Sequence, residues 1–510
     1  MKILEFRQNL AESLSKVIGA PANQLSLIIT MLCVIPFCFL NYLIHGKQAR
    51  LIYSLVLGFL FQISIYKYNS IHIFISAIST YLFIEYFGRK CSAYYVFILS
   101  LVYLSYLHIK RLFDDYGEWK ADDPTTIYMM SICKFSSLAF SYEDGAKDLK
   151  DMKNAHHREY RIVEKPTFLE VLSFIYFYPT SIIGPSIEFK DFINFINETD
   201  CYSNLNKKFS YIFKEGLKYF LFSFVVMAIY AILSNKFPVE AVVEKDFGKH
   251  SLLYTLIYIK ICIPGVRCRY YSGWILSYST VIFSGLSYTE KEKDGKIEKS
   301  MEKGCYGTVK TCEWSINCKD TINEWNKTIH VWLKYNVYTR VINIKRKPFQ
   351  NNFGLASFLT FICSAIWHGY YLTYYFTFFL LYCYQNACVV LNEIGVYKWI
   401  NEREYIKPFA TIFNCLAFET IGIAFFNLEW SKAVIGLRNM CYYPIIVNVG
   451  LFVITRFIKV PKKNKEKAKK NNEKIIEKPV EEKEKEKEKV IEKSSENKPV
   501  EEKTKETKVE

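Results

Sequence analysis

Apolar residues in this chain gather into long windows that carry little or no charge. The windows lie at residues 24–44, 51–67, 71–87, 92–109, 126–142, 167–183, 211–234, 251–265, 270–288, 353–368, 373–392, 408–427 and 433–457. A helix needs about 20 apolar residues to cross roughly 30 Å of bilayer hydrocarbon. Allowing for weaker windows such as 126–142, the pattern predicts about eleven spans and an all-α polytopic membrane protein.

Stretches outside these windows complete the domain organisation. Residues 1–21 are amphipathic and lack the apolar core and small-residue cleavage site of a removable signal peptide, which predicts an interfacial helix ending near Pro21. Residues 313–345 are also amphipathic and too polar for a lipid-facing span. Residues 461–510, rich in Lys and Glu, predict a disordered or transiently helical tail. The body between, 22–460, is expected to be one multi-span domain.

Composition and charge favour contact with a membrane over contact with nucleic acid. Of the 510 residues, 51% are hydrophobic and 17% aromatic, which is high for a soluble protein. The tail from Pro461 holds 17 Lys and 14 Glu, so its surplus of 3 leaves +13 of the formal charge of +16 on the body. Basic residues between spans are typical of cytoplasmic loops and of attraction to anionic lipid. The 15 cysteines form no CxxC pair, so no zinc or redox site is expected.

Two stretches combine tryptophan with polar side chains in apolar surroundings. One runs from Ser364 to Tyr371 and has His368 at its centre; the other runs from Trp325 to Leu333 and includes Asn326. Ionisable groups inside membrane-length segments usually face the protein interior or a water-filled cavity, and they are functional candidates by default. Both stretches are therefore candidate parts of a site.

These stretches resemble motifs of a known family, the membrane-bound O-acyltransferases, and within it the lysophospholipid acyltransferase branch. Ser364 to Gly369 is similar to the family's histidine motif, and Trp325-Asn326 with Trp332-Leu333 resembles its asparagine motif. Two further similarities are the Gly-Pro turn of the branch, at Phe177 to Pro185 followed by Glu188-Phe189, and the helix before its basic loop, at Tyr270 to Trp274 and Ser284 to Leu286. The chain departs from the branch pattern at Ile329, His330 and Leu372-Thr373, the last standing where Pro-Gly is usual.

The resemblance implies an enzyme that moves a fatty acyl chain from acyl-CoA to the free hydroxyl of a lysophospholipid, in phospholipid remodelling. It implies His368 as the general base, because a neutral imidazole can take the hydroxyl proton. It implies Asn326 as the group that orients the hydroxyl or stabilises the oxyanion. The expected substrate-binding residues are Trp325, Trp332, His330, Ser364, Trp367, Tyr371, Gly184 and Pro185.

The resemblance further implies spans around a central reaction tunnel that opens to cytosolic CoA and sideways to the bilayer. Acyl-CoA is then a co-substrate, and no bound cofactor and no metal are expected. The lipid chemistry implies the endoplasmic reticulum, and the basic cluster from Arg456 to Lys470 predicts a cytoplasmic carboxyl terminus. Lys327, Lys334, Arg340, Arg267 and Arg269 are available for the phosphates of CoA, although arginines near helix ends often only extend to the interface.

Other interpretations stay open at this point. His368 is alternatively a structural hydrogen-bonding residue, and Asn326 a contact between helices. His330, four residues after Asn326, is a rival base, and the pair His156-His157 in a charged stretch is expected to be solvated. The acceptor is alternatively a sterol, a diacylglycerol or a protein. A transporter or a catalytically silent scaffold is a further alternative, although the two halves share no visible repeat.

Overall fold

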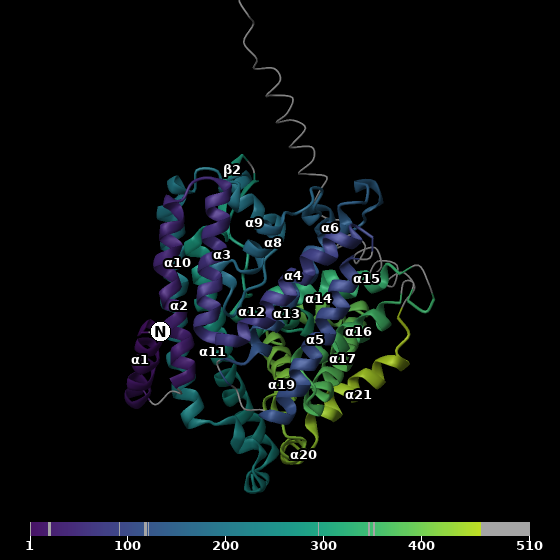
Figure 1. Cartoon of the computed structure of the whole chain (residues 1–510). Helices are drawn as coiled ribbons and strands as arrows, with labels where there is room; N and C mark the ends of the chain where they lie inside the picture. Colours follow the sequence, from purple (N-terminus) through teal and green to yellow (C-terminus); the bar gives the residue numbers. More distant parts are fainter. Residues whose placement is uncertain are drawn as a thin grey trace, which may run out of the picture.

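The computed structural model describes residues 2–18, 22–90, 92–116, 120, 122–293, 295–344, 347–349 and 352–460. The predicted tail, 461–510, lies outside the described residues. Nearly all regular structure in the described part is helical (Figure 1). The first helices are α1 (Lys2–Ile18), α2 (Ala22–Leu40), α3 (Lys47–Tyr66), α4 (Ser70–Phe87), α5 (Ser92–Asp114), α6 (Pro124–Asp144), α7 (Ala155–Tyr160), α8 (Phe168–Ile175), α9 (Phe189–Ile196), α10 (Leu205–Lys236) and α11 (Leu252–Ser284).

A β-hairpin separates these from a second run of helices. The hairpin consists of β1 (Tyr288–Lys293) and β2 (Lys296–Met301), antiparallel with Tyr288 opposite Met301. The elements after it are α12 (Val309–Trp314), α13 (Cys318–Glu324), α14 (Lys327–Leu333), the π-helical turn η8 (Lys334–Tyr338), α15 (Thr339–Ile342), α16 (Phe353–His368), α17 (Leu372–Glu393), α18 (Val396–Asn401), α19 (Lys407–Phe426), α20 (Trp430–Asn439) and α21 (Tyr443–Phe457).

Six helical stretches in the described residues are long and apolar enough to cross a membrane. They are Ala22–Leu43, Lys47–Phe87, Ser92–Asp114, Leu205–Val243, Leu372–Glu393 and Lys407–Phe426. A seventh is formed if α20 and α21, bent by 82° at their junction, make up one broken span. These stretches support an integral membrane protein, while the count of eleven stays a prediction.

Several predicted elements differ from those observed. The windows 251–265 and 270–288 form one continuous helix, α11, which contains Pro264 and three basic residues, Lys260, Arg267 and Arg269. The window 167–183 is helical only as far as Ile175, where α8 ends after eight residues. The chain then turns through Pro179 toward Gly184, within the stretch 176–185 where two prolines and a glycine predict a break. The basic loop predicted after α11 contains the hairpin, and the amphipathic segment 313–345 is broken into short helices.

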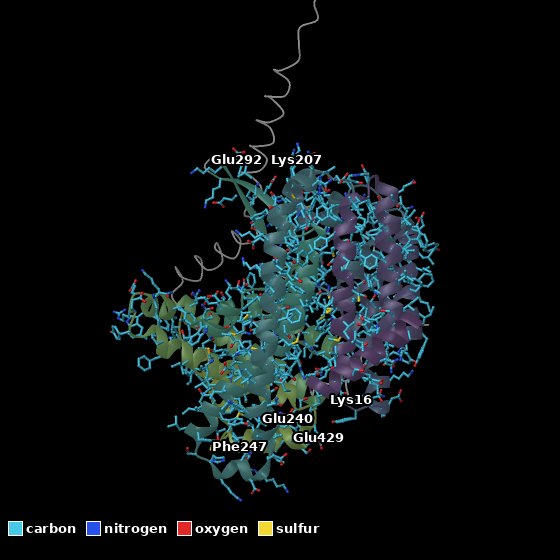
Figure 2. All side chains as sticks on the ribbon, turned by 90° about the vertical axis from the view of Figure 1, so that its left-hand side faces the viewer. Lys16, Lys207, Glu240, Phe247, Glu292 and Glu429 are labelled. Atoms are coloured by element: carbon cyan, nitrogen blue, oxygen red, sulfur yellow. The ribbon has the colours of Figure 1, made fainter. Side chains whose placement is uncertain are left out.

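Charged residues mark two opposite ends of the molecule (Figure 2). Lys207 and Glu292 lie at one end, and Lys16, Glu240 and Glu429 lie at the other. Helix α10 runs from one end to the other, since Lys207 is in its first turn and Glu240 follows its last. Apolar helices between two charged ends are the arrangement expected for a protein that spans a bilayer.

Helix α6 lies in the core, with neighbours on almost every side. Most of its residues are buried, including the polar side chains of Ser131, Lys134, Ser136 and Ser137. Lys134 Nζ donates to Thr180 Oγ1 at 2.7 Å and to the carbonyl oxygen of Ile175 at 3.0 Å, so this amine binds the end of α8 and the turn that follows. A buried polar group is tolerable only where hydrogen bonds replace those of water. The helix therefore forms a polar scaffold inside an apolar protein.

Candidate functional site

Asn326 lies between α13 and α14 in a left-handed backbone conformation, with φ 45° and ψ 56°. Asparagine adopts this conformation more readily than most residues. Its backbone oxygen accepts from His330 N at 3.0 Å, while its carboxamide has no hydrogen-bond partner among the described residues. The side-chain amide is therefore available to a substrate.

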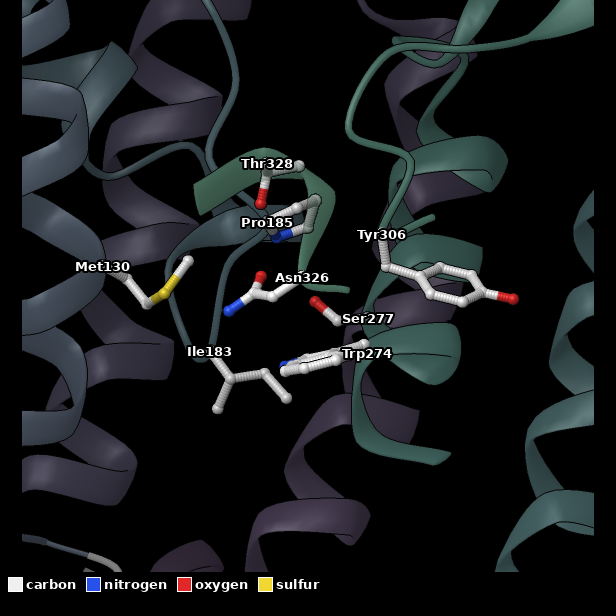
Figure 3. A pocket seen from close by; sticks show the side chains of 8 residues that line it. All are labelled: Met130, Ile183, Pro185, Trp274, Ser277, Tyr306, Asn326 and Thr328. Carbon is white, nitrogen blue, oxygen red and sulfur yellow. The ribbon is translucent and has the colours of Figure 1, made fainter. Parts of the chain in front are cut away.

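The Asn326 carboxamide points into a small cavity (Figure 3). The lining residues are Met130, Ile183, Pro185, Trp274, Ser277, Tyr306, Asn326 and Thr328. The cavity has a volume of about 10 Å³, which is room for about one water molecule. It is far too small for an acyl chain, so the reaction tunnel stays a prediction.

The predicted Gly-Pro turn forms one wall of this cavity through Pro185. Gly184 has φ +96°, a conformation that favours glycine, and a Cβ at this position would collide with the Met130 side chain. Its carbonyl oxygen accepts a hydrogen bond from Ser277 on α11. The turn is therefore held between α6 and α11, directly beside Asn326.

His368 is the last residue of α16, and its imidazole lies among aromatic rings. The ring centroids of Trp367, Phe378, Phe425 and Tyr374 are 4.7, 5.2, 5.2 and 5.5 Å from that of His368. His368 is not among the residues that line the cavity of Asn326. The structure thus places the two predicted catalytic residues in separate surroundings.

Helix α6 nevertheless brings the two motifs together. The indole of Trp332 donates to Ser136 Oγ, and the indole of Trp367 donates to the carbonyl oxygen of Met129, each at 2.8 Å. The two tryptophan rings are 6.4 Å apart. Met130, the next residue of the same helix, lines the Asn326 cavity. The asparagine and histidine motifs therefore meet on one face of the scaffold.

The other predicted substrate-binding residues lie nearby. Trp325 packs against Trp274, a cavity-lining residue, with ring centroids 5.0 Å apart. Ser364 is buried in α16, one turn before His368. Tyr371 precedes α17, and its ring is 5.6 Å from Tyr374, which contacts His368.

Sequence reasoning missed two contacts made by α5. His108 Nε2 lies 3.0 Å from the carbonyl oxygen of Trp367, and Tyr370 OH donates to Ser105 Oγ at 2.8 Å. The available signal was a polar residue at each position inside the apolar window 92–109. Their relation to the histidine motif depends on the fold.

His330 lies one turn after Asn326 on α14. Burial, followed by repulsion from Lys334, lowers the pKa of His330 to about 4. The imidazole is therefore neutral at physiological pH. Its ring makes no hydrogen bond to the described residues. Substrate binding by His330 stays a prediction.

The basic residues predicted for CoA differ in their availability. Arg267 is paired with Glu313 at 2.5 Å and Glu419 at 2.8 Å, and Arg340 binds Asp144 through two contacts of 2.8 and 2.5 Å. Carboxylates therefore already neutralise these two arginines, which makes them less available to a phosphate.

The other three cations are less committed. Lys327 pairs with Glu324 at 3.2 Å, and Arg269 stacks on Tyr270. Lys334 Nζ lies 4.9 Å from the Tyr335 ring centre and has no carboxylate partner among the described residues. Lys334 is therefore the most available of the five for a phosphate.

The pair His156-His157 was wrongly predicted to be solvated. His157 is buried on α7, and His157 Nε2 lies 3.0 Å from the carbonyl oxygen of Tyr335. His156 stacks on the Tyr335 ring at 3.8 Å. The charged stretch folds back onto η8, so its histidines become part of the core.

Comparisons with known proteins find curated relatives that match much of the chain. The chain is 27% identical to Lysophospholipid acyltransferase 6 of Drosophila melanogaster over 81% of its length, and 29% identical to Lysophospholipid acyltransferase of Saccharomyces cerevisiae over 67%. It is 27% identical to Membrane-bound glycerophospholipid O-acyltransferase 1 of Homo sapiens, over 72% of this chain and 74% of that protein. The chain spans 58% and 57% of the length of the first two relatives.

A family model matches more than half of the chain. The match extends over residues 123–428 and includes α6, the Gly-Pro turn and both motifs. Its description is MBOAT, membrane-bound O-acyltransferase family. The chain therefore belongs to the membrane-bound O-acyltransferase family.

Proposed function

We propose that this protein transfers a fatty acyl chain from acyl-CoA to the free hydroxyl of a lysophospholipid. The observation that carries the proposal is the contact between Trp332 of α14 and Trp367 of α16, both hydrogen-bonded to α6, which brings the asparagine and histidine motifs into one region. The names of the relatives support a lysophospholipid as the acceptor.

The reaction is a direct acyl transfer. The lysophospholipid hydroxyl oxygen attacks the thioester carbonyl carbon while His368 takes the hydroxyl proton, and the C–S bond then breaks. The proton passes from the imidazolium to the departing CoA thiolate, so atoms and charge balance. The position of His368 in the last turn of α16 supports this role, because a helix carboxyl terminus stabilises positive charge.

Asn326 supplies the amide that this reaction needs. Its carboxamide, which has no hydrogen-bond partner among the described residues, either holds the attacking hydroxyl or donates to the oxyanion. Loss of one such donor typically costs about 10²–10³ in rate. The cavity beside it must widen when the acyl chain enters, because its volume is only about 10 Å³. Lys334 is the proposed contact for a CoA phosphate.

We further propose that about eleven spans surround the site, that the protein resides in the endoplasmic reticulum, and that its carboxyl terminus is cytoplasmic. Basic residues at the end of α21 and directly after it support this orientation. A tag placed at the carboxyl terminus should be digested by protease added to sealed microsomes. Protection of that tag would reverse the orientation.

The central experiment assays the purified full-length protein against a panel of lysolipids and acyl-CoAs. His368→Ala should abolish transfer, Asn326→Ala should lower kcat by about 10²-fold or more, and Lys334→Ala should raise the KM for acyl-CoA alone. His45→Ala changes an exposed histidine outside the site and should retain full activity. Normal activity of a folded His368→Ala variant would refute the proposed function, and preference for a sterol or a diacylglycerol would replace the acceptor.

A further inference from the structure

The carboxyl-terminal turn of α16 is bound to α5 through His108. The last four carbonyl groups of a helix lack partners within that helix, and in α16 one of them belongs to Trp367. His108 is 3% exposed, and its Nε2 lies 3.0 Å from this carbonyl oxygen. A carbonyl only accepts hydrogen bonds, so Nε2 must carry the proton in this contact.

Further contacts fix the short segment 367–370 from two helices. Tyr370 OH donates to Ser105 Oγ on α5 at 2.8 Å, and the Trp367 indole donates to the α6 backbone at 2.8 Å. His368 lies within this segment, directly after Trp367, the residue whose carbonyl oxygen His108 contacts. Small movements of α5 are therefore transmitted directly to the backbone that carries His368.

The fit between His108 and this backbone is close. Gly369 has φ +127°, and a Cβ built on it would lie 3.2 Å from His108 Nδ1. Glycine is therefore favoured here both by its backbone conformation and by the approach of the imidazole. This contact leaves no room for a water molecule between His108 and the chain at Gly369.

We propose that His108 is a positioning residue for acyl transfer: its Nε2–H holds the Trp367 carbonyl and thereby sets the place of the His368 imidazole. The proposal rests on the proposed function, in which His368 is the base. A misplacement of about 1 Å in a catalytic group costs roughly 10²-fold in rate. His108 touches no reacting atom, so its effect is on kcat and not on substrate affinity.

Three substitutions of His108 separate positioning from simple packing. The amide of Gln reaches the place of Nε2 and can donate to the Trp367 carbonyl, whereas the shorter amide of Asn reaches only the place of Nδ1, and Leu cannot donate. His108→Leu and His108→Asn should lower kcat by about 10²-fold with the KM of both substrates unchanged. His108→Gln should recover activity to within about 10-fold of the unchanged protein.

The control is His250→Leu, the same change at an exposed histidine before α11. The His250 ring stacks on Tyr254 and makes no contact with α5 or with segment 367–370 among the described residues. This variant should keep its kcat. Thermal unfolding of each purified full-length variant is measured in parallel, so that activity is expressed per folded molecule.

The outcomes decide the proposal in every case. The proposal is overturned if His108→Gln and His108→Asn have equal kcat values. It is also overturned if the loss of kcat parallels the drop in unfolding temperature across all variants. If His108→Leu does not fold, the Gln and Asn pair still gives the answer, because both are small, polar and uncharged. His368→Ala in the same assay identifies the other failure: if it is active, the proposed function is wrong, whereas an inactive His368→Ala beside an unaffected His108→Asn rejects only the positioning role.

Discussion

Helices α6 and α10 differ in hydropathy and in burial: α10 is the more apolar of the two and also the more exposed. The span that contains α10 is strongly apolar, yet only 17% of its apolar window is buried. Its exposed side chains are Phe209, Phe213, Leu217, Leu221, Phe222, Phe224, Val225, Ile229 and Ile232. Helix α6 is the less apolar of the two, yet it is buried along most of its length.

Between these two helices, the more apolar one has the more exposed side chains, and the less apolar one lies beside the site. Apolar side chains suffice for a helix face that contacts only the hydrocarbon of the bilayer. The site requires groups that donate and accept hydrogen bonds between helices, and α6 supplies them through Lys134, Ser136 and Ser137. The buried serine of α10, Ser223, donates to the Phe220 carbonyl oxygen of its own helix and has no bond to another helix among the described residues.

The largest expected difference follows from truncating one leucine in each helix. Leu138 of α6 is 0% exposed and Leu221 of α10 is 55% exposed. Leu138→Ala should lower the free energy of unfolding by about 2–5 kcal/mol, because it leaves a cavity in the core. Leu221→Ala should change it by less than about 0.5 kcal/mol. Unfolding of both variants in the same detergent measures the contrast, and equal losses would contradict it.

A second pair compares two serines that are both fully buried. Ser136→Ala removes the acceptor of the Trp332 indole and should cost about 1–3 kcal/mol, since the N–H is left unpaired in the core. It should also lower acyl transfer, because Trp332 contacts the histidine motif. Ser223→Ala should cost less than about 0.5 kcal/mol, as alanine favours helix and no second helix loses a bond. Unfolding and activity measured together test both claims; a silent Ser136→Ala would remove α6 from the proposed scaffold.

The effect expected to be smallest at neutral pH is a change in the pH dependence of stability beside the end of α6. Burial, then repulsion from Arg340, lowers the pKa of His157 to about 4, against about 6.5 when unfolded. Between these values the unfolded chain binds more protons, so stability falls as the pH drops from about 6.5 to about 4. In His157→Gln, which keeps a donor for the Tyr335 carbonyl, the slope should be shallower by up to about 1.4 kcal/mol per pH unit.

Thermal unfolding at several pH values checks this slope. The control is His250→Gln, an exposed histidine before α11, which should leave the slope unchanged. An unaltered slope in His157→Gln would mean that another group carries the acid sensitivity.

The sequence by itself predicted the elements whose cause is local. Long apolar windows follow from bilayer thickness, so α2, α5, α17 and α19 begin and end within a few residues of the predicted limits. The break around Gly184-Pro185 follows from residues that cannot continue a helix. The two motif stretches were recognisable for the same kind of reason, since polar groups in apolar windows are costly without a purpose.

Only the tertiary structure decided which polar groups are paired and with what. Arg267 and Arg340 looked available in the sequence and proved to be bound to carboxylates far away in the chain, at Glu419 and Asp144. His108 Nε2 contacts a carbonyl oxygen 259 positions later in the chain. Hydrogen bonds and ion pairs of this kind depend on distances of a few ångströms between side chains, whereas hydropathy depends on composition alone. The windows could therefore be predicted from the chain, and the partners within the site could not.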